Sequence, residues 1–410
     1  MKLLLLGAGA SKAYQDPTTK VRMPIARDFL KTFHSLPISA NPWVLVGNVL
    51  HYATRYRKME LPEVFTSDID IEELHSEVQT RMLVALQQCR DSGQFTHEAM
   101  FFHATYVQLV CLFASTINEI QKADASPAHI SLARTLGPAD TVVTFNWDTL
   151  MDRALDSLGA WRTDYGYGLG PHQVFRNGWE STRHDPPANF VRLLKLHGST
   201  NWITSYIGID NENFTLCPLQ TASSDRLYVY EYTRKPYATY AGRFMDGYSD
   251  FSYGYYPPNL QDDPGKAAPP ETVRFMIRPK HPFTPEGAAD DSGLVSMPLI
   301  IPPVKDKSYA LYGELFTRLW AQASNALSAA DEIAIVGYSF PRTDHQSLTL
   351  FKNAFVKRTT IPQVVILDPE PARVMDIFHR EFGIPRSHVR EMREYFTPDF
   401  DSSRLWRLPS

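Results

Sequence analysis

Short, strongly apolar runs alternate with amphipathic stretches near both ends of the chain. Runs rich in Leu, Val and Ile are typical of buried strands, and apolar residues spaced three and four apart are typical of helices. Strands are predicted at Lys2–Leu6, Thr141–Thr144, Phe190–Leu196, Asp331–Val336 and Val364–Leu367, and helices from about Pro24 to Phe33 and at Thr149–Leu158, 308–330 and 344–357. This alternation predicts an α/β fold, with a Rossmann-like parallel sheet flanked by helices.

Two long segments depart from this alternation. The segment from about 40 to 130 is mostly helical in pattern, and apolar side chains at steps of three and four in Phe101–Ile120 predict a buried core stripe. The segment from about 206 to 295 is rich in Tyr and Pro, which favours strands and loops. We interpret both as insertions into one domain, 1–410, whose core segments are about 1–35, 130–205 and 295–400.

Composition narrows the class of protein. The 41 Lys and Arg against 45 Asp and Glu give a net charge of −4, so direct nucleic-acid binding is not indicated. Three cysteines without a Cys-x-x-Cys pair argue against a disulfide framework and a zinc ribbon, and no metal is expected. A cytoplasmic location fits this cysteine usage. The apolar run at Leu3–Leu6 is too short for a signal peptide, and no membrane segment is expected.

Polar or glycine-rich clusters follow each of the five predicted strands. Ligands of open α/β sheets bind at the carboxyl ends of the strands, so clusters far apart in the chain can meet in one site. After the first strand, Gly7-Ala8-Gly9-Ala10-Ser11 allows a sharp turn and the close approach of a pyrophosphate. The full GxGxxG fingerprint is absent because Lys12 stands at its last position, so an ordinary strand-end turn explains the motif equally well.

Three polar residues follow the next two strands. Asn146 and Asp148 can hold ribose hydroxyls, a carboxamide or a water, or they can simply cap the helix that follows them. His197 precedes Gly198-Ser199, and an imidazole there can take up a proton near neutral pH. A buried histidine bonded to a backbone carbonyl is the competing interpretation.

The last two predicted strands end in residues suited to a nucleotide. Gly337 and Ser339 suit phosphate or ribose contacts. Asp368 suits the hydroxyls of an adenosine ribose. Turns at strand ends are rich in Gly, Ser and Asp in any case, so each motif alone is weak.

Taken together, the order of these motifs resembles the sirtuin superfamily, and more closely the SIR2-like proteins of bacterial antiphage systems. The residues that carry the resemblance are Gly7, Ala8, Gly9, Ser11, Asn146, Asp148, His197, Gly198, Ser199, Gly337, Ser339 and Asp368. The resemblance implies that NAD is the substrate. It implies catalytic roles for His197, Asn146 and Asp148, and NAD contacts for the other nine residues.

The chain also departs from protein-deacylase sirtuins. Those enzymes usually carry a four-cysteine zinc module, which Cys89, Cys111 and Cys217 cannot form. Phe145 stands where they have Gln. These differences weigh against the binding of an acyl-lysine. The resemblance implies an NAD glycohydrolase, which cleaves NAD to nicotinamide and ADP-ribose. Nicotinamide leaves as a neutral molecule through an oxocarbenium-like transition state, so no general acid is needed.

Two alternatives stay open at the level of the sequence. One is NAD-dependent deacylation or ADP-ribosyl transfer, and the other is a non-catalytic sensor of NAD or ADP-ribose. The resemblance also implies an NAD-depleting effector of abortive infection, a homo-oligomer, and a separate trigger protein such as a HerA-type ATPase.

Overall fold

The computed structural model describes most of the chain. The residues it does not describe are 37–41, 122, 160, 177–178, 183–189, 206, 211, 219–226, 232–251, 257–274, 278–295, 303, 305–306, 308, 342–343 and 407–410. Much of the Tyr/Pro-rich insertion and most of its prolines therefore lie outside the described residues.

A six-stranded sheet in which every neighbouring pair is parallel forms the centre of the fold. Its order is β15-β14-β13-β1-β2-β5. The strands are β1 (Lys2–Leu6), β2 (Thr141–Thr144), β5 (Arg192–Lys195), β13 (Glu332–Val336), β14 (Gln363–Leu367) and β15 (Val389–Met392). The apolar runs of β1, β2, β13 and β14 are almost completely buried, as expected for strands covered on both faces.

The order of the strands creates a crevice. From β1 the chain builds the sheet through β2 and β5 on one side, and later through β13, β14 and β15 on the other. The carboxyl ends of β1 and β13 therefore lie at a topological switch point, where crossover connections diverge and leave a space for ligands.

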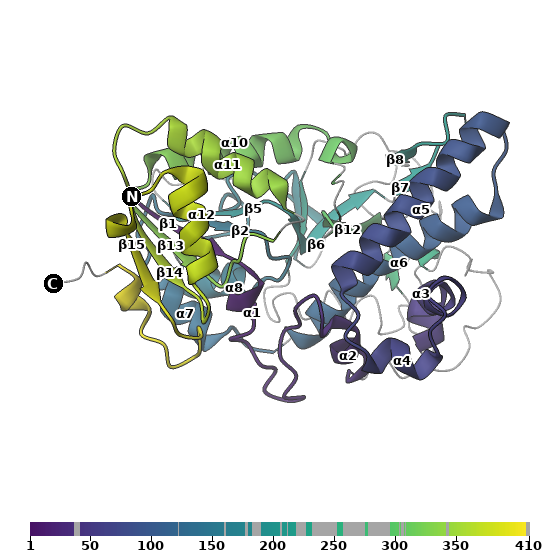
Figure 1. Cartoon of the computed structure of the whole chain (residues 1–410), viewed down its shortest axis with the longest axis horizontal. Helices are drawn as coiled ribbons and strands as arrows, with labels where there is room; N and C mark the ends of the chain where they lie inside the picture. The colour runs from purple at the N-terminus through teal and green to yellow at the C-terminus, as the bar shows by residue number, and fades with distance from the viewer. Residues whose placement is uncertain are drawn as a thin grey trace.

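Helices cover both faces of this sheet. Figure 1 shows α10 (Glu314–Ala329) and α11 (His345–Val356) above it, α12 (Ala372–Phe382) in front of it, and α7 (Pro127–Ala133) and α8 (Leu150–Ser157) below it. Gly383 ends α12 in the left-handed conformation, with φ of +70°. The predicted Rossmann-like α/β sheet is confirmed.

The helical insertion lies beside the sheet (Figure 1) and is built around two long antiparallel helices. Asp70 caps α5 (Ile71–Ser92), and Thr96 caps α6 (His97–Ile120). The shorter helices α2 (Phe29–His34), α3 (Pro42–Tyr56) and α4 (Leu61–Thr66) pack around them. By length and composition alone, α6 is a helix that could cross a membrane. Its most apolar stretch is 83% buried in the protein, which accounts for its composition.

A second, mostly antiparallel sheet continues from the first. Its order is β12-β6-β9-β3-β4. The strands are β3 (Gln173–Phe175), β4 (Trp179–Ser181), β6 (Gly198–Ser205), β9 (Tyr228–Tyr230) and β12 (Ser296–Ile300), and two hairpin-like pairs, β7 (Ile207–Ile209) with β8 (Leu216–Pro218) and β10 (Ser252–Tyr256) with β11 (Phe275–Ile277), complete the described part of the insertion.

The chain passes from the first sheet to the second at His197 and Gly198. Gly198 has φ of +78°, and a Cβ there would lie 2.1 Å from the carbonyl oxygen of Leu299. Only glycine therefore fits this corner. The backbone of His197 is held by Ile301, whose N–H donates to the His197 carbonyl over 2.8 Å.

Three local predictions differ from the structure. The helix expected from Pro24 begins at Phe29, because the Ile25 amide bonds to the Asp28 carboxylate and the Ala26 carbonyl accepts from Ile71. The turn expected at Gly7–Ser11 is a single helical turn, α1 (Ala8–Ser11). The edge strand β15 was not predicted, because its sequence Val-Arg-Glu-Met is only half apolar.

Candidate active site

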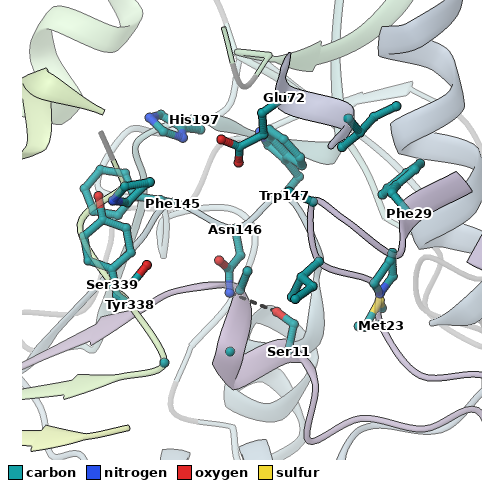
Figure 2. A pocket seen from close by; sticks show the side chains of 18 of the residues that line it. Ser11, Met23, Phe29, Glu72, Phe145, Asn146, Trp147, His197, Tyr338 and Ser339 are labelled. Atoms are coloured by element: carbon teal, nitrogen blue, oxygen red, sulfur yellow. Dashed lines mark hydrogen bonds between the residues drawn. The ribbon is translucent and has the colours of Figure 1, made fainter. Parts of the chain in front are cut away.

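A cavity of about 590 Å³ opens at the carboxyl ends of the parallel strands (Figure 2). Its lining comes from the ends of β1, β2, β5, β13 and β14, together with the first turn of α5 and part of α6. The volume lies within the range of about 300–1,000 Å³ typical of small-molecule sites. Nine of the twelve residues singled out in the sequence line it: Ala8, Gly9, Ser11, Asn146, Asp148, His197, Gly337, Ser339 and Asp368.

The glycines at the ends of β1 and β13 serve close backbone packing. The Gly7 amide donates to Val336 O over 3.1 Å, and the Gly9 amide to Gly337 O over 3.0 Å. Gly337 has φ of +61°, and a Cβ there would lie 2.4 Å from the Ala10 nitrogen. The Gly7 and Gly9 amides are therefore already hydrogen-bonded to the end of β13 and to the residue that follows it. The glycines bring the two turns together at the switch point.

The carboxamide of Asn146 has a fixed orientation. Its Nδ2 donates to Gly7 O over 2.7 Å and to the Ser11 hydroxyl over 2.9 Å. A carbonyl oxygen only accepts hydrogen bonds, so the contact with Gly7 identifies the nitrogen end of the amide. Both N–H groups are thereby used, and what Asn146 can offer a ligand is its carbonyl oxygen. Figure 2 shows the residue at the floor of the cavity beside Ser11.

Asp148 is tied into the same network and is almost completely buried. Its Oδ2 accepts from the Ser11 hydroxyl over 2.5 Å, and its Oδ1 accepts from the Leu150 amide over 3.1 Å. The second bond caps the first turn of α8, as one interpretation of the sequence expected. The first bond orients the hydroxyl that holds Asn146.

A buried ion pair supports this loop from below. The Lys195 ammonium donates to the Asp148 carbonyl oxygen and lies 3.1 Å from Asp152 Oδ2, with the two side chains 1% and 0% exposed. The Tyr167 hydroxyl donates to the other oxygen of Asp152 over 2.6 Å. The position of Asp148, and through it that of Asn146, therefore depends on charges within the core.

His197 lies across the cavity from this loop and is 6% exposed. Its ring meets the edge of Phe145, with centroids 5.0 Å apart. Phe145 in turn stacks on Tyr338, with centroids 4.6 Å apart and planes inclined by 15°. Figure 2 shows His197, Phe145 and Tyr338 together on one side of the cavity.

Two charged groups adjoin the imidazole. Lys307 Nζ lies 3.2 Å from His197 Nε2 and 2.9 Å from Asp344 Oδ1, while Asp344 Oδ1 lies 3.7 Å from Nε2. Burial, followed by the positive charge of Lys307, lowers the pKa of His197, and Asp344 and the Phe145 carbonyl oppose this shift. The lowered pKa favours a neutral resting imidazole near neutral pH, which is able to accept a proton.

The other predicted residues are divided between the lining and the layer behind it. Gly337, Ser339 and Asp368 line the cavity at the ends of β13 and β14. Gly7, Gly198 and Ser199 lie behind the lining: the Ser199 hydroxyl, fully buried, donates to Asn201 Oδ1 over 2.6 Å. Their placement favours a supporting role over the ligand contacts expected from the sequence.

Several lining residues were missed by the sequence analysis. Lys307 and Asp344 sit in loops rather than directly at strand ends, and Glu72 belongs to the helical insertion. Asp344 precedes α11 and looks in sequence like an ordinary helix cap, which gave no sign of its contact with Lys307.

The wall opposite His197 is apolar. Its side chains come from α2 and the residues before it, from α6 and from the loop after β2. They are Met23, Phe29, Phe113, Ile117 and Trp147. Figure 2 shows Met23, Phe29 and Trp147 on this side, with the Glu72 side chain pointing into the space between them and His197. The cavity thus joins a polar floor to an aromatic wall, as ligand sites for flat heterocycles commonly do. Within the part of the chain that the structure describes, no group of three or more His, Cys, Asp or Glu residues could hold a metal ion.

Comparisons with known proteins gave matches among solved structures alone. No protein-family model and no curated protein matches the chain. Three similar solved structures are one of Sir2 enzymes described for mechanism and regulation (12% identity, TM-score 0.32, covering 98% of this chain and 89% of that one), a mutant Sir2 homologue with ADP-ribose (14%, 0.32, 98% and 91%) and Sir2 with a peptide and NAD⁺ (11%, 0.34, 99% and 91%). These are proteins of the family that the motifs resemble. TM-scores this low carry no weight for the activity.

Proposed function

We propose that the protein is an NAD glycohydrolase, which breaks the bond between nicotinamide and ribose. The observation that carries the proposal is that His197 and Asn146, from the ends of two different strands, line one cavity at the topological switch point of the sheet. This crevice is where doubly wound α/β folds bind dinucleotides.

The order of the strands suggests how NAD would lie. Asp368 follows β14, the Gly337 and Gly9 turns follow β13 and β1, and Asn146 and His197 follow β2 and β5. Along the sheet this sequence matches an adenosine ribose, a pyrophosphate and a nicotinamide ribose. In this arrangement Asp368 accepts from the adenosine ribose hydroxyls. The pyrophosphate crosses the packed turns near Ser11 and Ser339, and the nicotinamide ring lies against the aromatic wall.

In the proposed reaction the glycosidic C–N bond breaks, nicotinamide leaves as a neutral molecule, and a water oxygen bonds to the anomeric carbon. The Asn146 carbonyl oxygen accepts a hydrogen bond from that water or from a ribose hydroxyl, which orients it. His197 takes the released proton at Nε2, either from the water or from the hydroxyl. Asp148 acts through Ser11 by keeping Asn146 in place.

Product analysis tests the proposal and separates it from the alternatives. Purified protein is incubated with NAD, alone and with the product of the neighbouring gene. Nicotinamide and ADP-ribose in equal amounts support hydrolysis. O-acyl-ADP-ribose from an acylated peptide, or ADP-ribose attached to an acceptor, identifies transfer instead. Tight binding of NAD without products under any of these conditions identifies a sensor.

The cellular role that we propose is NAD depletion during phage infection, in the cytoplasm, by a homo-oligomer that responds to a separate trigger such as a HerA-type ATPase. This part rests on the sequence resemblance. Cells carrying the gene and its neighbour should lose NAD on infection, and cells carrying His197→Ala should not. Equal NAD loss in both would refute it.

A further inference from the structure

Three ionisable side chains from different parts of the fold meet at the edge of the cavity. His197 follows β5, Lys307 precedes η3 (Tyr309–Tyr312), and Asp344 precedes α11. The Lys307 and Asp344 side chains are 4% and 2% exposed and lie 2.9 Å apart. A buried ion pair adds little stability compared with an apolar pair of similar size, so its presence beside the proposed base suggests a functional reason.

Each charge acts on His197 in the opposite direction. The Phe145 carbonyl accepts a hydrogen bond from the imidazole, and Lys307 donates to Nε2, so the neutral ring has its acceptor nitrogen directed at the ammonium. The Asp344 carboxylate favours the protonated ring, while Lys307 disfavours it. Without Lys307, the carboxylate 3.7 Å from Nε2 would favour the imidazolium, which cannot act as a base.

We propose that Lys307 and Asp344 are positioning residues for the proton transfer to His197. Lys307 keeps the resting imidazole available, and Asp344 accepts the new Nε2–H bond once the ring carries the proton. This inference rests on the proposed function and assigns two further residues to the same site.

The proton balance of the step is simple. In the resting site the Nε2 lone pair accepts from Lys307. When the water or hydroxyl proton moves to Nε2, the hydrogen bond between Lys307 and Nε2 breaks, and Nε2–H turns to Asp344 Oδ1. Lys307 retains its bond to Asp344. At rest the neutral imidazole, the ammonium and the carboxylate have a net charge of zero. After the transfer their net charge is +1, which is the charge of the proton taken from the water or the hydroxyl.

The remaining ionisable groups around this cluster are compatible with the proposal. The Tyr338 hydroxyl donates to Asp344 Oδ2 over 2.8 Å and holds the carboxylate from behind. Burial raises the pKa values of Tyr338 and Tyr309, so both stay uncharged. Glu72 enters the cavity from α5 (Figure 2). It is unchanged in both Lys307 variants described next, so its influence on His197 is common to the two.

The test compares Lys307→Met with Lys307→Arg in the full-length protein. The pKa of His197 is measured by NMR of ¹³C-labelled histidine, with the signal assigned by its loss in His197→Gln, and the pH profile of kcat/KM for NAD is measured in parallel. In Lys307→Met we expect the His197 pKa, and the apparent pKa of the acid limb of the kcat/KM profile, to rise together by at least one pH unit. Activity should be reduced at pH values below the raised pKa and should recover to within threefold of wild type at high pH. Lys307→Arg keeps the charge and should keep both values within 0.5 unit.

Asp344→Asn tests the second half of the proposal. It should lower kcat by at least tenfold across the whole pH range with little change in KM, because the imidazolium loses its acceptor. If this variant fails to fold, Lys307→Met combined with Asp344→Asn removes the uncompensated charge, and its kcat is compared with that of Lys307→Met alone. A plateau kcat that does not fall on loss of the carboxylate refutes the role of Asp344.

The outcomes distinguish this inference from the proposed function. An unchanged His197 pKa in Lys307→Met, or a loss of activity that is uniform at all pH values, refutes the role of Lys307 whether or not NAD is cleaved. A raised His197 pKa in a protein that never cleaves NAD refutes the proposed function and the catalytic part of the inference, and leaves the electrostatic coupling established.

Discussion

The side-chain amide of Asn146 lies 2.7 Å from the carbonyl oxygen of Gly7, a residue 139 positions earlier in the chain. This contact joins the end of β2 to the end of β1 and fixes which atom of Asn146 faces the cavity. The side chain therefore has only its carbonyl oxygen to offer a ligand, although it carries both a donor and an acceptor.

Asn146→Ala removes that acceptor and should lower kcat for NAD cleavage by ~10²–10³-fold, the usual effect of losing one oriented polar group near a reacting centre. Asn146→Asp should be equally inactive, because a carboxylate cannot donate to Gly7 O and would be repelled by it. Asn353→Ala on the exposed face of α11 is the matched control. Retention of more than a tenth of the wild-type kcat in either Asn146 variant would contradict the role.

Gly337→Ala should destabilise the whole domain. A left-handed conformation costs a non-glycine residue about 1–2 kcal/mol, and the new Cβ would also meet the Ala10 nitrogen at 2.4 Å. The combined loss should exceed about 3 kcal/mol in urea unfolding. Gly383→Ala is a close control, because Gly383 has φ of +70° with nothing within 4 Å of a Cβ. Equal losses in the two variants would show that the approach of the β1 and β13 turns is unimportant.

Lys195→Met should cost about 3–5 kcal/mol in the free energy of unfolding, because it leaves Asp152 charged and buried without its cation. The double variant Lys195→Met/Asp152→Leu should regain part of this loss, since no charge is then stranded. It should still be impaired in NAD cleavage, because Asp148 loses a hydrogen bond to its carbonyl oxygen. Urea titrations of the three proteins check the stability, and a single variant within about 0.5 kcal/mol of wild type would contradict the expectation.

Stability should fall as the pH drops below about 6.5. Burial lowers the pKa of His75 to about 3 and those of His103 and His129 to about 4. Between pH 6.5 and 4 the unfolded chain takes up protons at these sites while the folded protein does not. Each site therefore contributes a loss of up to about 1.4 kcal/mol per pH unit.

His75→Phe isolates one of these sites. Among the residues that the structure describes, neither ring nitrogen of His75 has a hydrogen-bond partner. The ring packs on Tyr106 and Phe113, so phenylalanine should fit. The variant should be at least as stable as wild type at pH 7.5 and should show a smaller slope of unfolding free energy between pH 6.5 and 5. The same slope in both proteins would mean that His75 is not the neutral, buried group described here.

The central sheet could be predicted from the sequence because its inner strands are apolar runs or, in β2, a β-branched run, and they end in glycine or polar turns. The runs that became β1, β2, β13 and β14 needed no long-range information. The edge strand β15 was missed because Arg390 and Glu391 interrupt its apolar character, as edge strands allow. The start of α2 was misplaced because the backbone before it bonds to α5, far along the chain.

The candidate site was predicted in part for a similar reason. Asn146, His197 and Asp368 directly follow strands, so the rule for parallel sheets places them at one edge. Lys307 and Asp344 could not be found this way, because they approach the cavity from loops whose course depends on tertiary packing. The hydrogen bonds from the Gly7 and Gly9 amides to Val336 and Gly337 also join distant segments of the chain, and local sequence does not specify such a pairing.

The most direct test of the proposed activity is a comparison of wild type and His197→Gln, in which NAD cleavage and NAD binding are measured on the same samples. We expect wild type to form nicotinamide and ADP-ribose, and His197→Gln to bind NAD with an affinity within about fivefold of wild type while cleaving it at least ~10²-fold more slowly. Cleavage of NAD by His197→Gln at the wild-type rate would contradict the account.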